Sequence, residues 1–154
     1  MIEMIQIKLT SSELQLMSMF QSVTGATARD CIIDEKLDRV IFVVNEVDMG
    51  LAIGKNGTTI KTLQDLVGKK IELVEFSDDV IKFIRNMLSA SLVLDVKINE
   101  KDDGTKIAIV VVDSKKKGVV VGREGRNAEK ARLLVKRYFQ ISNVLILSSE
   151  QVLR

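Results

Sequence analysis

In two stretches of the chain, apolar residues are spaced as in a helix that buries one face. Residues 10–23 open with Thr10 and Glu13, which stand at the spacing of an N-terminal capping box. Residues 77–90 open with Ser77, the expected N-cap, followed by two acids suited to a first helical turn. The apolar positions then recur every three or four residues. They are Leu16, Phe20 and Val23 in the first stretch and Ile81, Ile84 and Leu88 in the second.

Each predicted helix is followed by two runs rich in β-branched residues, which predict strands. The runs cover 27–35 and 39–45 after the first helix, and 92–100 and 106–113 after the second. A short turn joins the two strands of each pair, such as the sequence KDDGTK between the later two, so each pair is expected to be antiparallel. Two further helical patterns then lead to a third strand, most simply parallel to the second.

The chain is an internal duplication. The segment VIFVVNEVDMGLAIGKNGTTIKTLQDLVGKKIEL at 40–73 aligns without a gap to AIVVVDSKKKGVVVGREGRNAEKARLLVKRYFQI at 108–141. This offset of 68 residues aligns three glycines of the first copy with three of the second: Gly50, Gly54 and Gly57 with Gly118, Gly122 and Gly125. Each copy therefore predicts the order helix, strand, strand, helix, turn, helix, strand.

This order predicts an α+β fold, an α/β sandwich made of two tandem units. We place the units at 1–76 and 77–154. Each is expected to form a three-stranded mixed sheet covered on one face by three helices.

Each unit carries a Gly-x-x-Gly turn between two predicted helices. A nucleoside-triphosphate loop needs four residues between its first glycine and the Gly-Lys pair, whereas only three separate Gly50 from Gly54. A tight turn with glycine at both ends instead lets a phosphodiester backbone approach closely. It offers backbone N–H groups at the start of the next helix, where the helix dipole favours an anion. Neighbouring apolar residues are candidates for the floor of a groove that holds bases: Ile53, Ile60, Val121 and Ala128.

Both units resemble KH domains, with AIGKNG and VVGREG as the signature turns. The helix and strand before each core are similar to the type II arrangement. Two such domains in direct tandem resemble the KH pair of the NusA transcription elongation and termination factors, most closely the short archaeal members. The resemblance implies a factor in transcription elongation, termination or antitermination that binds single-stranded RNA and contacts RNA polymerase or other transcription factors. The bacterial family's N-terminal polymerase-binding domain and S1-type barrel have no counterpart in this sequence.

Positive charge is concentrated in the second unit. Residues 114–137 hold nine basic and two acidic side chains, a local net charge of +7 in a chain of net charge +2. Such an asymmetry directs a polyanion to one side. The predicted RNA-binding residues are Gly54, Lys55, Asn56, Gly57, Ile60, Lys61, Lys116, Lys117, Gly122, Arg123, Glu124, Gly125, Arg126 and Lys130. Glu124 places a carboxylate where a phosphate is expected. Whether the second turn binds RNA therefore stays open.

Composition disfavours catalysis. The chain has no histidine, and its one cysteine, Cys31, lies in an apolar strand pattern that predicts an inert, buried thiol. We therefore expect no enzyme, no metal site and no cofactor. No apolar run is long enough to cross a membrane, so a cytoplasmic protein is expected. Two other roles stay open: an RNA-binding factor of ribosome assembly or translation, and a protein-interaction scaffold with degenerate KH cores.

Overall fold

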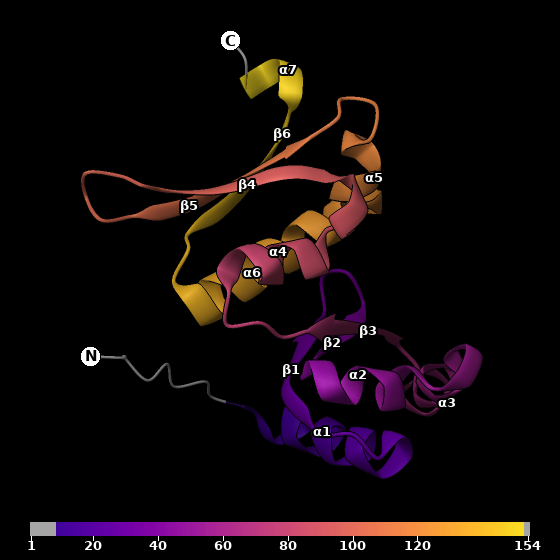
Figure 1. The fold of residues 1–154 in the computed structure, drawn as a ribbon. Helices are drawn as coiled ribbons and strands as arrows, with labels where there is room; N and C mark the ends of the chain where they lie inside the picture. Colours follow the sequence, from indigo (N-terminus) through magenta and orange to yellow (C-terminus); the bar gives the residue numbers. More distant parts are fainter. Residues whose placement is uncertain (1–8, 153–154) are drawn as a thin grey trace. The chain divides into compact units, whose positions relative to one another are not determined.

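The computed structural model describes residues 9–152, which divide into two compact units between Ser77 and Asp78. The division falls one residue beyond the expected boundary. The first unit runs through these elements: α1 (Ser11–Thr24), β1 (Ala28–Asp34), β2 (Arg39–Val44), α2 (Glu46–Ile53), the 3-10 turn η1 (Lys55–Gly57), α3 (Thr58–Val67) and β3 (Lys70–Glu75). Figure 1 shows α1, α2 and α3 together on one side of its sheet.

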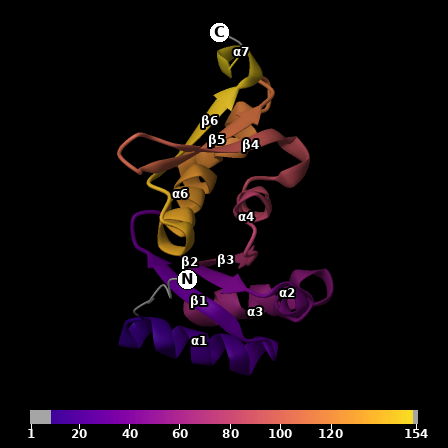
Figure 2. The same cartoon turned by 60° about the vertical axis from the view of Figure 1, so that its left-hand side comes forward.

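The second unit repeats this order with one extra helix at its end. Its elements are α4 (Val80–Met87), η2 (Ala90–Leu92), β4 (Val93–Glu100), β5 (Lys106–Val112), α5 (Lys117–Val121), η3 (Arg123–Gly125), α6 (Arg126–Phe139), β6 (Asn143–Ser148) and α7 (Ser149–Val152). Helices α4 and α6 lie on one side of its sheet in both ribbon views (Figures 1 and 2). The predicted α+β sandwich is confirmed in each unit.

Both sheets have the predicted mixed topology. In the first, β1 is antiparallel to β2 and β2 is parallel to β3, so Phe42 is paired with Cys31 on one side and Leu73 on the other. The second sheet pairs β4, β5 and β6 in the same directions. The first strand of each sheet also shifts register near its start, beside Asp30 and Asp95. Each of these carboxylates accepts a hydrogen bond from the next backbone N–H, at 2.8 and 2.9 Å. The two units therefore share a register shift as well, at a position without a glycine.

The first helix begins as predicted and closes a small apolar core. The Thr10 hydroxyl accepts from the Glu13 N–H, and the Glu13 carboxylate accepts from the Thr10 N–H, which completes the capping box. Phe20 on α1 stacks on Phe42 of β2 with their ring centroids 4.6 Å apart. Cys31 belongs to the same cluster and is fully buried, as predicted.

The predicted start of the fourth helix is wrong by two residues. Asp79 is the N-cap rather than Ser77, and its carboxylate accepts from the N–H groups of Ile81 and Lys82. Of the predicted apolar stripe, Ile84 and Leu88 are fully buried, whereas Ile81 in the first turn of α4 is 39% exposed. Phe83 and Met87 complete the buried face of the helix.

A buried arginine joins the three strands of the first sheet. The fully buried Arg39, at the start of β2, lies 2.8 Å from a carboxylate oxygen of Asp34 on β1. Its second contact, at 3.0 Å, is to Glu72 on β3. Both carboxylates are nearly buried, with side chains 12% and 11% exposed. Removing the cation therefore leaves two desolvated anions facing each other.

We predict that Arg39→Leu lowers the free energy of unfolding of the first unit by about 3–5 kcal/mol, the usual cost of breaking a buried ion pair. Urea titration followed by circular dichroism measures this loss. The matched control is Lys69→Ala. Lys69 pairs with Asp38 at 3.8 Å with both side chains exposed, and its loss is expected to change stability by less than about 0.5 kcal/mol. Equal effects in the two variants would contradict the structural role of Arg39.

Candidate nucleic-acid interface

The first glycine of each turn has a backbone conformation that only glycine adopts readily. Gly54 has φ 76° and ψ 170°, and Gly122 has φ 85° and ψ 163°. A side chain there is also excluded by space. A Cβ on Gly54 would overlap the Thr59 side chain, and one on Gly122 would lie 2.9 Å from the Asn127 amide nitrogen. The first glycine is therefore required by the turn itself.

The third and fourth residues of both turns lie in the left-handed region. Asn56 and Glu124 have φ/ψ of 57°/27° and 58°/22°, and the glycines that follow have 72°/16° and 74°/16°. Asparagine adopts this conformation more readily than glutamate. The two turns share one backbone conformation, although the second places a less suitable residue in it.

Most N–H groups of the turn donate within the protein. Gly54 donates to Gly50 O at 3.0 Å, Gly57 to Gly54 O at 3.2 Å, and Thr58 to Lys55 O. The second turn has the same three bonds. Within residues 9–152, the N–H groups of Lys55 and Asn56 are the ones in this turn without a protein acceptor. The N–H groups left over thus lie in the middle of the turn, two and three residues before the start of α3 at Thr58.

The helix after the turn is held by residues that the sequence analysis did not single out. The Thr58 hydroxyl donates to Lys55 O at 2.8 Å and supports the end of the turn. Thr59 and its counterpart Asn127 lie against the Cα of the first glycine. Both follow Gly54 or Gly122 by five residues, so the repeat alignment contained the signal.

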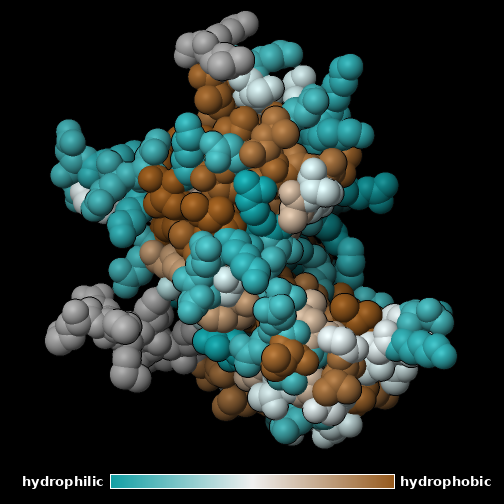
Figure 3. Space-filling view, viewed as in Figure 1, coloured by the Kyte–Doolittle hydropathy of each residue, from teal (hydrophilic) through white to brown (hydrophobic). Residues whose placement is uncertain are grey.

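Apolar residues reach the surface beside the first turn. Ile53 is 40% exposed and Ile60 is half-buried, as a groove floor requires. Leu51, two residues before Ile53, is also exposed. Figure 3 shows apolar side chains at the surface of the first unit among polar ones. In the second unit Val121 is half-buried, but Ala128 is buried and gives little surface to a ligand.

The cations flanking the turns divide into exposed and enclosed groups. Those exposed are Lys55, Lys61, Lys115, Lys116 and Arg123. Lys117 is half-buried and donates to a side-chain oxygen of Gln151 at 3.2 Å.

The two predicted RNA-binding residues on α6, Arg126 and Lys130, are largely enclosed. Arg126 is half-buried, and Lys130 is only 8% exposed. Both share a helical row with Leu134, which is fully buried, so the row turns inward along the helix. The exposed positive charge is therefore concentrated at the turn and just before it.

Residues 9–152 contain no cluster of three or more cysteine, aspartate or glutamate side chains placed to hold a metal ion. None of the helices in that range is both long and apolar enough to span a membrane.

Comparisons with known proteins agree with this geometry. A family model described as a KH domain matches residues 16–99, and one described as a NusA-like second KH domain matches residues 80–147. The probable transcription termination protein NusA of Halobacterium salinarum is 37% identical over 90% of this chain and 96% of its own length. That of Methanocaldococcus jannaschii is 32% identical over 96% of this chain and 79% of its own. A solved structure, the crystal structure of APE1850, is 37% identical with a TM-score of 0.80, covering 90% of this chain and 99% of its own.

Two copies of the same helix-and-strand order, each with its Gly-x-x-Gly turn, define a protein with tandem type II KH domains. The extent of the similarity then fixes the family. The chain belongs to the NusA family and matches its archaeal members over most of their length.

We predict that the two glycines of a turn respond differently to alanine. Gly54→Ala combines a glycine-only conformation with steric overlap and is expected to destabilise the first unit by about 3 kcal/mol or more. Gly57→Ala meets open space and bears only the left-handed penalty of about 1–2 kcal/mol. Urea denaturation of both variants measures the difference. Similar losses would show that the Thr59 contact does not constrain the turn.

Proposed function

We propose that this protein binds single-stranded RNA at both Gly-x-x-Gly turns and acts, without catalysis, in transcription elongation and termination or antitermination. One observation carries the proposal: the same unusual backbone conformation occurs twice, at Gly54–Gly57 and Gly122–Gly125, each time beside exposed basic residues. Turns of this kind clamp about four nucleotides in KH modules. The names of the NusA relatives support the transcriptional role.

The chemistry of the first turn suits a phosphodiester backbone with bases beside it. The Lys55 and Asn56 N–H groups donate to phosphate oxygens, while the Lys55 side chain supplies positive charge. Apolar surface at Ile53 and Ile60 then receives the bases. Phe20, Phe42 and Phe83 are fully buried, so base selection depends on groove shape and hydrogen bonds rather than on stacking against these rings.

The second turn binds RNA more through charge. Lys115, Lys116 and Arg123 are exposed there. Before the first turn, Glu46 and Asp48 stand where the second unit has Ser114 and Lys116. Contacts to phosphates weaken as salt rises because bound counterions are released. Two weak sites in one chain make the second binding event intramolecular, which raises the overall affinity.

The proposal includes partners and location. RNA polymerase or another transcription factor is the expected protein partner, and the cytoplasm the expected compartment. A non-catalytic role fits a chain without histidine, whose sole cysteine is buried within the first core.

We predict that reversing one charge in each turn weakens RNA binding while the fold is kept. Lys55→Asp and Arg123→Asp leave both glycines in place and put a carboxylate against the phosphate. Each is expected to raise the Kd for a labelled single-stranded RNA at least about tenfold, and the combined variant more, as expected for lost phosphate contacts. Fluorescence anisotropy across a salt series measures Kd, and thermal melting checks the fold.

The matched controls are Lys36→Asp and Lys101→Asp, which change the net charge equally in the strand hairpins of the same units. Their Kd is expected to rise only about twofold through the general field of the protein. If the turn and hairpin variants weakened RNA binding equally, the loss would reflect the change in net charge and not contacts at the turns. No RNA binding by the parent chain would reject the proposal and favour the scaffold role.

We predict that Glu124→Asn improves the second turn. The change gives position 124 the residue that occupies the same left-handed conformation in the first turn. It removes both strain and a carboxylate facing the phosphate, so stability is expected to rise by about 0.5–1 kcal/mol and RNA affinity several-fold. The reciprocal variant Asn56→Glu is expected to lower both. Weaker RNA binding by Glu124→Asn would instead assign Glu124 a direct contact with a base.

A further inference from the structure

The strands of the second sheet are apolar along most of their length. Residues 107–112 of β5 read IAIVVV, and residues 144–147 of β6 read VLIL. Uninterrupted apolar runs of this kind are typical of strands that are buried on both faces. In both ribbon views, however, α4 and α6 lie on one side of this sheet (Figures 1 and 2). The sequence thus supplies apolar side chains for a second face as well.

Burial shows which residues form that second face. Ala108 and Val110 of β5 are fully buried, and so is Val144 of β6. Successive residues of a strand point to opposite faces, so the residues between these lie on the face away from α4 and α6. Those that are only half-buried there are Ile107, Ile109, Leu145 and Leu147.

Two neighbouring rows across this face have the same composition. In one row, Lys97 of β4 is paired with Ile109, and Ile109 is paired with Leu145. The next row, read in the same order, is Asp95, Val111 and Leu147. We refer to these two rows as the open face. Its two charged side chains are 62% and 52% exposed, and the lysine nitrogen lies 3.9 Å from an aspartate oxygen. Each row therefore has one exposed charge and two apolar residues, and the two charges have opposite signs.

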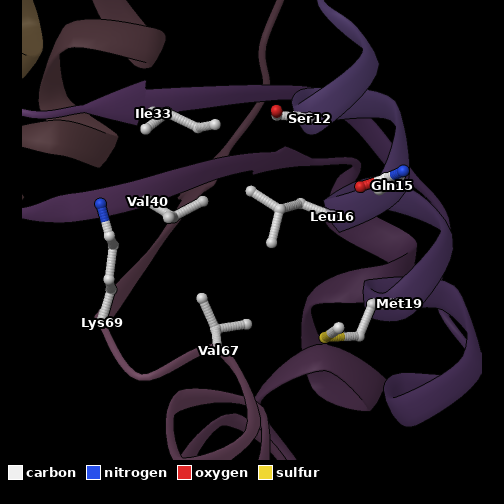
Figure 4. A pocket seen from close by; sticks show the side chains of 8 residues that line it. All are labelled: Ser12, Gln15, Leu16, Met19, Ile33, Val40, Val67 and Lys69. Atoms are coloured by element: carbon white, nitrogen blue, oxygen red, sulfur yellow. The ribbon is translucent and has the colours of Figure 1, made fainter.

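The open face differs in shape from the apolar surface of the first unit. A pocket of about 280 Å³ lies there beside α1, and Figure 4 shows Leu16 and Val67 pointing into the same space. A pocket of that size receives a side chain, whereas a sheet face is buried by another layer of secondary structure. The open face therefore calls for a sheet or a helix as its partner.

A second copy of the chain provides a layer with matching charges. We consider two open faces that meet across a two-fold axis running perpendicular to the strands and between the two rows. Such an axis places each row of one copy over the other row of the second copy. Asp95 then lies opposite Lys97 of the second copy, and the same pair occurs again on the other side of the axis. The apolar residues of β5 and β6 meet each other.

The charges also select this axis over the alternative. A two-fold axis parallel to the strands would place β4 of one copy over β6 of the other. Both charged side chains would then be buried against leucines without a partner, which costs desolvation energy. Only the perpendicular axis pairs the charges and buries apolar residues on apolar residues.

We propose that this protein forms a two-fold dimer in which two open faces pack sheet on sheet, with two Asp95–Lys97 pairs between the copies. Strands of six to eight residues spaced about 4.8 Å apart give a face of about 300 Å². A stable interface buries roughly 800 Å² per partner, so the dimer is expected to be weak, with a Kd on the order of 100 µM.

The first experiment is sedimentation equilibrium of the full chain without RNA. Over about 10 µM to 1 mM, which brackets this Kd, the mean mass is expected to rise from that of one chain toward that of two. Ile109→Asp places a carboxylate in the middle of the open face and is expected to keep the mass at one chain. The matched control is Leu66→Asp, because Leu66 is 61% exposed on α3 of the first unit. This control is expected to dimerise like the parent.

Exchange of charges tests the axis itself. Asp95→Lys leaves the open face with two positive charges, and Lys97→Asp leaves it with two negative ones. Each variant alone is expected to dimerise at least about tenfold more weakly, because like charges then meet across the axis. An equimolar mixture of the two is expected to recover the affinity of the parent, since every pair is again of opposite sign. Thermal melting checks each fold, because the Asp95 carboxylate also accepts from the Val96 N–H at 2.9 Å.

Four results would overturn the proposal. A mass of one chain at every concentration would show that a second copy does not cover the open face. A dimer that persists in folded Ile109→Asp would place the interface elsewhere. A mixture no more dimeric than its components would reject the two-fold arrangement. Loss of RNA affinity in folded Ile109→Asp, measured by fluorescence anisotropy, would assign the open face to RNA. Because dimerisation is measured without RNA, its failure leaves the proposed RNA function intact.

Discussion

The backbone conformation of the first glycine in each turn is the constraint on which the candidate interface depends. With ψ near 170° at a positive φ, Gly54 ends α2 sharply and lets α3 start after a single 3-10 turn. The Thr59 side chain occupies the space that a Cβ would need, which fixes the first residues of α3 against the turn. As a result, the N–H groups of Gly54, Gly57 and Thr58 all donate to carbonyl oxygens of the turn or of the end of α2. One glycine thereby determines both the helix geometry and the site.

Most of the fold follows from patterns visible in the sequence. Strand order and direction could be predicted because short hairpins and a long crossover each allow few arrangements. The spacing of residues alone does not show which of two neighbouring candidates is the N-cap of a helix. Ser77 and Asp79 are both good N-caps, and in the structure it is the Asp79 carboxylate that accepts from the first N–H groups of α4.

The candidate site was less predictable than the fold. The turns were identified because their glycines repeat at a fixed offset, and the structure gives both turns the same conformation. Exposure was harder to predict, because a helical row such as Arg126, Lys130 and Leu134 changes from surface to core within two turns. Lys130 was predicted to bind RNA, yet its side chain is only 8% exposed. The buried Arg39 cluster was missed entirely, since its three charges are adjacent only after the strands pair.

Duplication makes the two units controls for each other. Where they agree, as in the turn conformation and the aspartate at the register shift, the feature belongs to the fold that both units share. Where they differ, the feature belongs to one unit only. Asn56 of the first turn corresponds to Glu124 of the second. The first unit therefore has the less strained turn, whereas the second has more exposed positive charge before its turn.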